Sequence, residues 1–246
     1  MRIPAAVPMI TRWRQAFRER KQFTTTGREP FYALAAQYAT AARVSVDIGG
    51  GHGEFLDYLS PAQSTSKQVY LLEQNPASRK TAQHRHPSVS VLPYTAPNRL
   101  PFDSGIVEFV HCSHIVEHLN PSDLYALLQE IDRVLRVGGI LVISAPLLSS
   151  TFYGDFSHVK PYNPRVFLNY LSGRPDRQST ATVISTSYQT VRLVYRYTDE
   201  APDGWGSPNA AVDLPIWLGR KVLYRLGVRR YAANGFTLVL RKEGAA

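Results

Sequence analysis

Residues 46–53 read Val-Asp-Ile-Gly-Gly-Gly-His-Gly and place alternating glycines directly after an apolar run. Glycine at such positions lets the chain turn tightly with positive φ and lets a ligand lie close to the main chain. The spacing fails the dinucleotide pattern Gly-x-Gly-x-x-Gly, because Glu54 or Leu56 stands where the third glycine is needed. No Gly-Lys-Ser/Thr follows, which excludes a phosphate-binding P-loop. The loop therefore predicts a different ligand, bound beyond the carboxyl end of a strand.

Residues 152–164 form a second segment whose side chains could do chemistry, Phe-Tyr-Gly-Asp-Phe-Ser-His-Val-Lys-Pro-Tyr-Asn-Pro. It combines Asp155 and His158 with Lys160 and several aromatic side chains. Histidine can take up a proton near neutral pH, and a carboxylate can orient it or bind hydroxyl groups. We predict His158 as the general base, with Asp155 either orienting it or binding hydroxyl groups of the acceptor. The alternative is that both side chains only hold this loop through hydrogen bonds.

A metal-site pattern is also present, because His114, Glu117 and His118 match the inverted zinc-protease spacing His-x-x-Glu-His. That motif needs its histidines on one helix together with a third ligand. Here the motif begins at the end of an apolar run that is typical of a strand, and we expect His118 to pack at the start of the following helix. We therefore predict no metal site. Ser113 and His114 are expected to face the ligand cleft from the end of this strand.

Sequence patterns typical of strands and of helices alternate along the chain. The elements that they predict must position the residues named above. Short apolar runs are typical of buried strands, and apolar residues three and four apart are typical of helices. Their alternation predicts an α/β fold with a parallel sheet covered by helices on both faces. Gly138 and Gly139 are expected to end the helix before the fifth strand. Strands are expected at residues 43–48, 68–73, 88–92, 106–112, 140–144, 182–197 and 235–241, and helices at residues 31–40, 53–59, 76–84, 121–136, 164–171 and 214–230.

Four segments, in this order, resemble the motifs of class I methyltransferases that use S-adenosylmethionine (SAM). The glycine loop resembles their motif I, and residues 71–76, Leu-Leu-Glu-Gln-Asn-Pro, resemble the end of their second strand. Residues 100–103 and 107–119 resemble the stretch around their fourth strand, and residues 130–139 resemble the helix and turn before the fifth. The resemblance covers about residues 43–145. It implies a Rossmann-like, doubly wound sheet of seven strands, mostly parallel with an antiparallel last strand, and SAM as the cofactor.

The resemblance also implies roles for single residues. Glu73 stands where the family's acidic residue binds both ribose hydroxyls of SAM, and a carboxylate can accept both hydrogen bonds. The alternatives are that Asp47 only shapes the loop and that Glu73 is a solvent-exposed acid. The family's acidic contact to the adenine amino group has no counterpart in residues 94–99, so Thr95, Asn98 or backbone carbonyls would replace it. The residues expected to bind SAM are Asp47, Gly49, Gly51, Gly53, Glu73, Gln74, Thr95, Ser113 and His114.

Residues 155–164 resemble a segment of bacterial methyltransferases linked to cell-surface polysaccharide synthesis, in their Asp, His-Val-Lys-Pro-Tyr and Asn-Pro. The resemblance implies methyl transfer to a hydroxyl of a sugar or another small molecule in glycan synthesis. One alternative is an RNA methyltransferase, which the net charge of +9 favours, although no RNA-binding module is visible. A second alternative is a non-catalytic protein of the same fold that binds a partner. We do not expect nucleic acid as a partner.

Positive charge is concentrated at the two ends of the chain. Residues 1–30 hold seven basic and two acidic residues, residues 217–246 hold seven and one, and the stretch between them is slightly acidic. Basic ends suit an anionic surface such as membrane lipid or a phosphorylated carrier, although solvated charge that aids solubility is the simpler alternative. Residues 214–230 mix apolar and basic side chains as interfacial helices do, without one clean apolar stripe. Contact with an anionic membrane surface is therefore a hypothesis.

The single cysteine, Cys112, excludes an intrachain disulfide framework, and no apolar run of 18 residues suggests a membrane-spanning helix. Residues 1–17 lack the apolar core of a secretory signal. We therefore expect a cytoplasmic protein, with peripheral contact at the inner membrane as the hypothesis for its basic ends. We expect a basic arm at residues 1–30 and a single domain at residues 31–246, with residues 198–234 inserted before the last strand.

Overall fold

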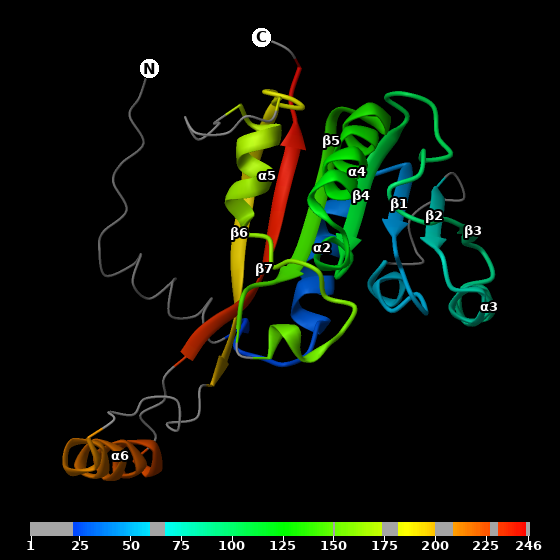
Figure 1. The fold of residues 1–246 in the computed structure, drawn as a ribbon. Coiled ribbons are helices and arrows are strands. Elements are labelled where there is room, and N and C mark those ends of the chain that lie inside the picture. The colour runs from blue at the N-terminus through cyan, green and yellow to red at the C-terminus, as the bar shows by residue number, and fades with distance from the viewer. Residues whose placement is uncertain are drawn as a thin grey trace, which may run out of the picture. The chain divides into compact units, whose positions relative to one another are not determined.

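The computed structural model describes residues 22–59, 67–149, 151–173, 182–199, 209–226 and 231–244. Seven strands form one sheet in the order β3-β2-β1-β4-β5-β7-β6 (Figure 1). β1 pairs in parallel with β2 and β4, β2 with β3, and β4 with β5, whereas β7 runs antiparallel to β5. The predicted α/β fold, mostly parallel with an antiparallel last strand, is confirmed. The strands are β1 (Val44–Ile48), β2 (Gln68–Glu73), β3 (Ser90–Pro93), β4 (Val107–Ser113), β5 (Leu135–Pro146), β6 (Tyr188–Asp199) and β7 (Tyr231–Lys242).

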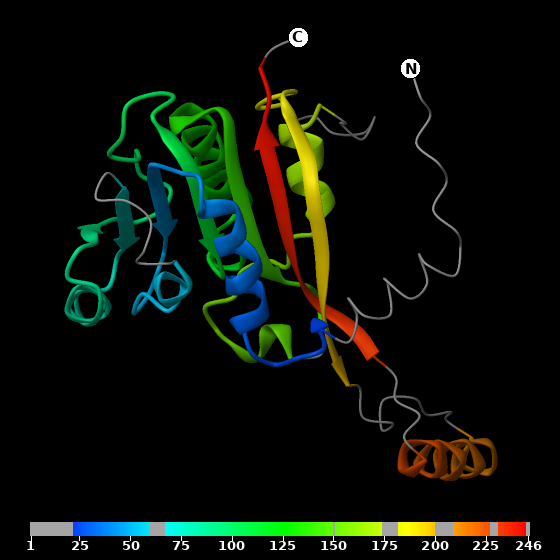
Figure 2. The ribbon, with the colours of Figure 1, turned by 180° about the vertical axis from the view of Figure 1, so that it is seen from behind.

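Helices cover both faces of the sheet. α4 (Pro121–Val134) and α5 (Pro164–Leu171) lie on the face turned to the viewer in Figure 1. α2 (Glu29–Ala39) lies on the opposite face and stands in front in Figure 2. The central strands are therefore buried on both sides, and β5 is buried from residue 140 to residue 146. The other helices among the described residues are α3 (Pro76–Arg85), α6 (Ala210–Arg225) and three short 3₁₀ helices, η1 (Phe55–Tyr58), η2 (Val116–His118) and η3 (Phe152–Gly154).

The sequence explains the start and the packing of α4. The side-chain oxygen of Asn120 accepts a hydrogen bond from the backbone N–H of Asp123 at 3.0 Å, which caps the helix. Pro121 occupies the first turn, where its missing N–H is not needed. The apolar residues at helical spacing form a stripe that is buried in the protein core. The stripe consists of Leu124, Leu127, Leu128, Ile131 and Val134.

The end of α4 differs from the sequence-based prediction. The helix ends before Leu135, which already begins β5, so the glycine pair 138–139 does not terminate it. These glycines lie in an irregular part of β5 instead. Val107 of β4 pairs with Leu135, but two residues later Phe109 pairs with Ile140, so that β5 holds extra residues between the two pairs. The first glycine has a φ of 79°, a conformation that the bulge requires and that glycine adopts without strain.

Two other elements are shorter than predicted. The segment after the glycine loop forms a single 3₁₀ turn, η1, and residues 60–66 beyond it lie outside the described part. Strand β6 begins at Tyr188 and not at residue 182, because the backbone N–H groups of Ile184 and Ser185 bond to the carbonyl of Tyr170 at the end of α5. These hydrogen bonds hold the chain to a helix end before it can join the sheet.

The chain divides into two compact units. One comprises Arg28–Val194 and Gly235–Ala246 and holds the glycine loop; the other comprises Met1–Gly27 and Tyr195–Asn234. In the second unit the backbone N–H of Tyr197 bonds to the carbonyl of Phe23 at 2.9 Å. The expected arm at residues 1–30, domain at 31–246 and insertion at 198–234 stay predictions, because residues 1–21, 200–208 and 227–230 lie outside the described part.

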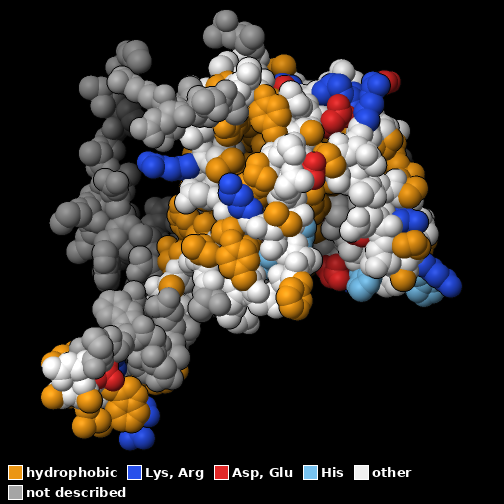
Figure 3. Space-filling model, in the orientation of Figure 1, with side chains coloured by type: hydrophobic (Ala, Val, Ile, Leu, Met, Phe, Trp, Pro, Cys, Tyr) orange, Lys and Arg blue, Asp and Glu red, His pale blue; other side chains and the backbone are white. Residues whose placement is uncertain are grey.

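Helix α6, in the second unit, exposes both apolar and basic side chains (Figure 3). None of its sixteen residues is buried. Within it, the ammonium of Lys221 lies 3.8 Å from the ring centroid of Trp217, a cation–π contact. The basic residues Arg229 and Arg230, which the sequence pattern assigns to the same helix, lie outside the described part. No helix among the described residues is long and apolar enough to cross a membrane.

Candidate active site

The carboxyl ends of β1, β2 and β4 point to the same edge of the sheet, where the loop after β5 also lies (Figure 1). A cleft of about 440 Å³ opens at this edge. Gly49 and Glu73 line it after the first two strands, and His114, His118 and Asp123 line it after the fourth. A cleft of this size, at the edge where parallel strands end, is typical of small-molecule sites.

The glycine loop presents bare main chain to this cleft. Gly49 has a φ of 65°, and a Cβ at this position would overlap Cδ1 of Ile115. Its backbone N–H bonds to the carbonyl of Leu72 at 2.6 Å, which holds the loop against the end of β2. Gly51 and Gly53 also have positive φ, at 55° and 83°. Glycine is therefore needed at Gly49, because a side chain there would collide with Ile115, which lines the same cleft.

The side chain of Glu73 connects the glycine loop to the start of α3. Its Oε2 accepts a hydrogen bond from the backbone N–H of Gly51 at 3.1 Å, and its Oε1 accepts one from the N–H of Asn75 at 2.7 Å. The carboxylate is therefore fixed in orientation between the glycine loop and the start of α3. Each oxygen keeps a second lone pair, so the group can still accept hydrogen bonds from two hydroxyls. These features fit the ribose of SAM, which the sequence resemblance assigned to this residue.

Asp47 lies beneath the loop and does not line the cleft. Its Oδ1 is 2.7 Å from Nδ1 of His111 on β4, and both side chains are buried. A Cβ at Gly50 would come within 2.6 Å of the other oxygen, Oδ2, so the loop folds tightly over this carboxylate. The ring of His111 stacks on Phe55 at 3.9 Å. His111 was not predicted from the sequence, because its partner is 64 residues away in the chain.

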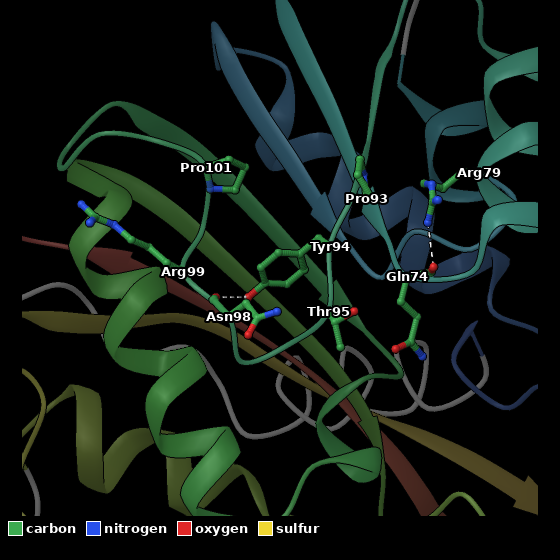
Figure 4. Close-up of a pocket in the computed structure, with 8 residues that line it drawn as sticks. All are labelled: Gln74, Arg79, Pro93, Tyr94, Thr95, Asn98, Arg99 and Pro101. Atoms are coloured by element: carbon green, nitrogen blue, oxygen red, sulfur yellow. Dashed lines mark hydrogen bonds between the residues drawn. The ribbon is translucent and has the colours of Figure 1, made fainter.

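A second cavity, of about 430 Å³, adjoins the cleft (Figure 4). Gln74 and Tyr94 line both cavities, whereas Thr95 and Asn98 line only the second. The hydroxyl of Tyr94 donates to the backbone carbonyl of Asn98 at 2.8 Å, which fixes this turn. Burial raises the pKa of Tyr94, so its hydroxyl stays a donor at physiological pH. Thr95 and Asn98, which were predicted to replace the missing acidic contact to adenine, thus line the same cavity next to the cleft.

His114 has an unusual backbone, with a φ of 56° that non-glycine residues rarely adopt. Such strain is concentrated at functional sites, where surrounding contacts hold it in place. Here Nδ1 of His114 is 3.0 Å from Oε1 of Glu117, and its backbone N–H bonds to the carbonyl of Ser144 at 2.9 Å. Ser113, the last residue of β4, pairs with Ser144. His114 thus lies at the edge of the cleft as predicted from the sequence.

The loop after β5 is fastened to η2, the turn that follows β4. The backbone N–H groups of Val159 and Lys160 both bond to the carbonyl of Glu117, at 2.8 and 3.2 Å. Nδ1 of His118 bonds to the carbonyl of Ser157 at 3.0 Å, so this ring lies at the cleft instead of packing at a helix start. These contacts bring two segments about 40 residues apart together at one side of the cleft.

His158 and Asp155 are neighbours, but their side chains form no hydrogen bond with each other. Nε2 of His158 is 3.9 Å from Oδ2 of Asp155, whereas its Nδ1 is 2.7 Å from the carbonyl of Phe152. The other oxygen of Asp155 accepts hydrogen bonds from the hydroxyl and the backbone N–H of Ser157, which hold the pKa of this exposed carboxyl below its usual value. The backbone therefore orients His158, and Asp155 keeps one oxygen for another partner.

Comparisons with known proteins agree with this architecture. Residues 46–143 match the family model of a methyltransferase domain. No curated protein matches the chain. A SAM-dependent methyltransferase from Archaeoglobus fulgidus is 20% identical, with 96% of this chain and 100% of that chain covered and a TM-score of 0.58.

Two further solved structures have related folds. A geranyl diphosphate C-methyltransferase from Streptomyces coelicolor A3(2), in complex with Mg²⁺, geranyl diphosphate and S-adenosyl-L-homocysteine, is 14% identical, covers 87% of this chain and 78% of its own, and has a TM-score of 0.57. The N-methyltransferase NodS from Bradyrhizobium japonicum WM9 is 11% identical, covers 88% and 95%, and has a TM-score of 0.56. The chain thus has the fold of SAM-dependent methyltransferases, and the domain match at residues 46–143 supports a class I methyltransferase.

Proposed function

We propose that this chain is a SAM-dependent methyltransferase that transfers a methyl group to a hydroxyl of a sugar or another small molecule. The observation that carries the proposal is the Glu73 carboxylate, which two backbone N–H groups fix beside the glycine-lined cleft. A carboxylate held in this way can accept both ribose hydroxyls without reorganising. Gly49, with no side chain, lets the main chain approach the same ligand.

SAM, when bound, supplies an electrophilic methyl carbon next to a positively charged sulfur. The task of the protein is then to hold the cofactor and the acceptor in line, because positioning provides much of the rate enhancement in such a displacement. Glu73 would hold the ribose, and Gln74 and Thr95 would meet the base. Ser113 and His114 would lie near the other end, while Asp47 supports the loop from beneath through His111.

The acceptor side rests on the loop at residues 152–164. A hydroxyl is a weak nucleophile, so removal of its proton helps the transfer. The carbonyl of Phe152 accepts a hydrogen bond from Nδ1 of His158, so Nε2 of the neutral ring carries a lone pair and can take up that proton. The second oxygen of Asp155 could bind another hydroxyl of a sugar. This loop, and not the solved structures, supports a hydroxyl acceptor, since the two named neighbours are C- and N-methyltransferases.

The basic ends and α6 support an acceptor on a phosphorylated or lipid carrier, met at an anionic membrane surface on the cytoplasmic side. Seven large apolar residues of α6 are exposed, next to basic side chains. Apolar residues beside lysine and arginine are typical of helices that lie in the interface of an anionic membrane. The exposed apolar residues are Val212, Leu214, Ile216, Leu218, Val222, Leu223 and Tyr224.

Methyl-labelled SAM tests this function directly. The protein would be incubated with separate fractions of nucleotide sugars, lipid-linked glycans, RNA and protein. We expect label in a sugar fraction, as an ether that survives base treatment. We expect His158→Asn to reduce turnover on the order of 10²-fold or more, with unchanged SAM affinity. His84→Asn, at an exposed position on α3, is the matched control. Label in RNA alone would reject the acceptor class, and full turnover of His158→Asn would reject the role of this residue.

A further inference from the structure

Three side chains that can bind a metal ion meet next to the cleft, and one of them, His118, lines it. Glu117 and His118 lie on η2 after β4, and His158 lies on the loop after β5. Each offers one ligand atom, and these three atoms lie within 4.8 Å of one another. The His-x-x-Glu-His spacing could not show this group, because its third member comes from a segment 40 residues further along the chain.

Both imidazoles are oriented in the way that metal-binding histidines require. Nδ1 of His118 is 3.0 Å from the carbonyl of Ser157, and Nδ1 of His158 is 2.7 Å from the carbonyl of Phe152. A carbonyl oxygen can only accept a hydrogen bond, so both Nδ1 atoms carry the proton. The Nε2 atoms are then unprotonated in the neutral rings and available as ligands. Histidines that bind metals usually have this arrangement, with the second ring nitrogen donating to a carbonyl or a carboxylate.

Glu117 brings an unsatisfied negative charge to the same place. Its side chain is only 1% exposed. Oε1 is 3.0 Å from Nδ1 of His114, but no donor among the described residues reaches Oε2. A buried carboxylate oxygen without a partner is costly, and proteins usually satisfy it with a hydrogen bond or a metal ion. A cation bound between Glu117 and the two imidazoles would satisfy it.

We propose that Glu117, His118 and His158 bind a divalent transition-metal ion at the acceptor side of the cleft. Two imidazoles and one carboxylate suit Zn²⁺, Fe²⁺ or Co²⁺ better than Mg²⁺ or Ca²⁺, which prefer oxygen ligands alone. Three protein ligands with one position left open are typical of catalytic sites, whereas structural sites are closed.

The ion also has a chemical role, and this part of the proposal rests on the proposed function. A hydroxyl oxygen of the acceptor would bind the ion, which lowers the pKa of the hydroxyl. Its proton passes to solvent, the oxygen bonds to the methyl carbon of SAM, and the C–S bond breaks to leave the thioether. In this arrangement His158 is a metal ligand and does not itself take the proton.

Metal binding can be tested without SAM and without an acceptor. The full chain, treated with a chelator and dialysed, would be titrated with Co²⁺ and followed by its visible absorption, and Zn²⁺ would then displace the Co²⁺. We expect one equivalent to bind. His118→Asn and His158→Asn should each weaken binding at least tenfold, Glu117→Gln should do the same, and His84→Asn should bind like the wild type. The buried Glu117 could be needed for folding, so the two histidine variants, neither of them at a buried position, decide the result.

The Co²⁺ titration can fail while SAM still binds, so its results test the metal site independently of the SAM site. The proposal is overturned if the wild type binds no stoichiometric Co²⁺, or if the histidine variants bind it as well as His84→Asn does. His118→Asn also shows whether His158 acts in catalysis as a general base or as a metal ligand. A free base at His158 would work without His118, whereas a metal ligand would not, so His118→Asn should lose turnover and saturating Zn²⁺ should restore at least part of it. Full turnover of His118→Asn in the presence of a chelator would contradict the chemical role of the ion.

Discussion

Gly49 combines a left-handed backbone with a close approach to Ile115 and to the cleft. Gly49→Ala should therefore weaken SAM binding at least tenfold as well as strain the chain. Gly138→Ala is the matched control, because Gly138 has a similar φ of 79° but no atom within 4 Å of a Cβ there. Both variants should lose about 1 kcal/mol of stability or more from the positive φ. Calorimetric titration with SAM, beside urea unfolding, would check this.

The prediction for Gly49 is tested by the difference in SAM affinity between Gly49→Ala and Gly138→Ala. If Gly49→Ala binds SAM as tightly as Gly138→Ala does, the main chain at Gly49 does not contact the cofactor. Gly49→Ala should be the less stable of the two variants, because its Cβ would also meet Ile115. The SAM affinities are therefore compared under conditions in which urea unfolding shows both variants to be fully folded.

The residues of the site were only partly predictable from the sequence. The glycine loop and Glu73 have a local pattern, because a strand, a loop and the next strand follow one another within 30 residues. The contact of Asp47 with His111 depends on the register of β1 against β4, which no local pattern encodes. The group formed by Glu117, His118 and His158 depends in the same way on how one loop folds over another. The orientation of the His158 ring could not be predicted from the sequence either, because the backbone carbonyl of Phe152, and not Asp155, fixes it.

A carboxylate on α4 ties this helix to the segment before β4. Oε2 of Glu130 accepts the backbone N–H of Leu100 at 2.9 Å, and Arg133 bonds to Glu130 and to the carbonyls of Leu100 and Phe102. The hydrogen bond from Arg133 lowers the pKa of Glu130. Glu130→Gln should therefore reduce the free energy of unfolding by about 1 kcal/mol at pH 7, a modest value because the pair is partly exposed.

The pH dependence of this contribution has a definite sign. Because the pKa of Glu130 is lower in the folded chain, its stabilisation is fully present above the unfolded value of about 4.3. It is lost as the pH falls through the lower, folded value. Urea unfolding at pH 7 and near pH 3 should thus show a difference between the wild type and Glu130→Gln that narrows with acidification. A difference that stays constant over this range would show that the charge of Glu130 contributes nothing.

Most elements were predictable because their signals are local. Asn and Pro mark the starts of α3, α4 and α5, and the apolar spacing of α4 identifies its buried face. The boundaries that differ depend on tertiary contacts. The glycine pair 138–139 looks like a helix end in sequence, yet the pairing of β5 with β4 draws residues 135–139 into a bulge of the sheet. The start of β6 is likewise set by hydrogen bonds to the end of α5.

The basic side chains and the exposed apolar side chains of α6 predict that the protein binds anionic membranes. The full chain should sediment with vesicles that contain phosphatidylglycerol and not with pure phosphatidylcholine, and high salt should weaken the binding. Leu214→Glu combined with Leu218→Glu should reduce partitioning at least tenfold, because burial of each leucine contributes about 1.5–3 kcal/mol. Val137→Glu is the control, since Val137 is equally exposed, but lies on β5.

Two results would contradict the membrane proposal. One is that the wild type fails to bind anionic vesicles at low salt. The other is that Val137→Glu reduces binding as much as the α6 double variant does, which would make the effect one of added negative charge anywhere on the chain. Only the basic ends and the mixed character of residues 214–230 were visible in the sequence; the exposure of α6 required the structure.

The measurement that bears most directly on the proposed function is a calorimetric titration of the protein with SAM and with S-adenosyl-L-homocysteine. We expect saturable binding at one site. Glu73→Gln should weaken it about 10- to 100-fold, because an amide cannot accept from two N–H groups and two hydroxyls as the carboxylate can. Glu54→Gln, at an exposed position beside the same loop, should bind like the wild type. Absence of binding to the wild type, or unchanged affinity of Glu73→Gln, would contradict the assignment of this cleft to SAM.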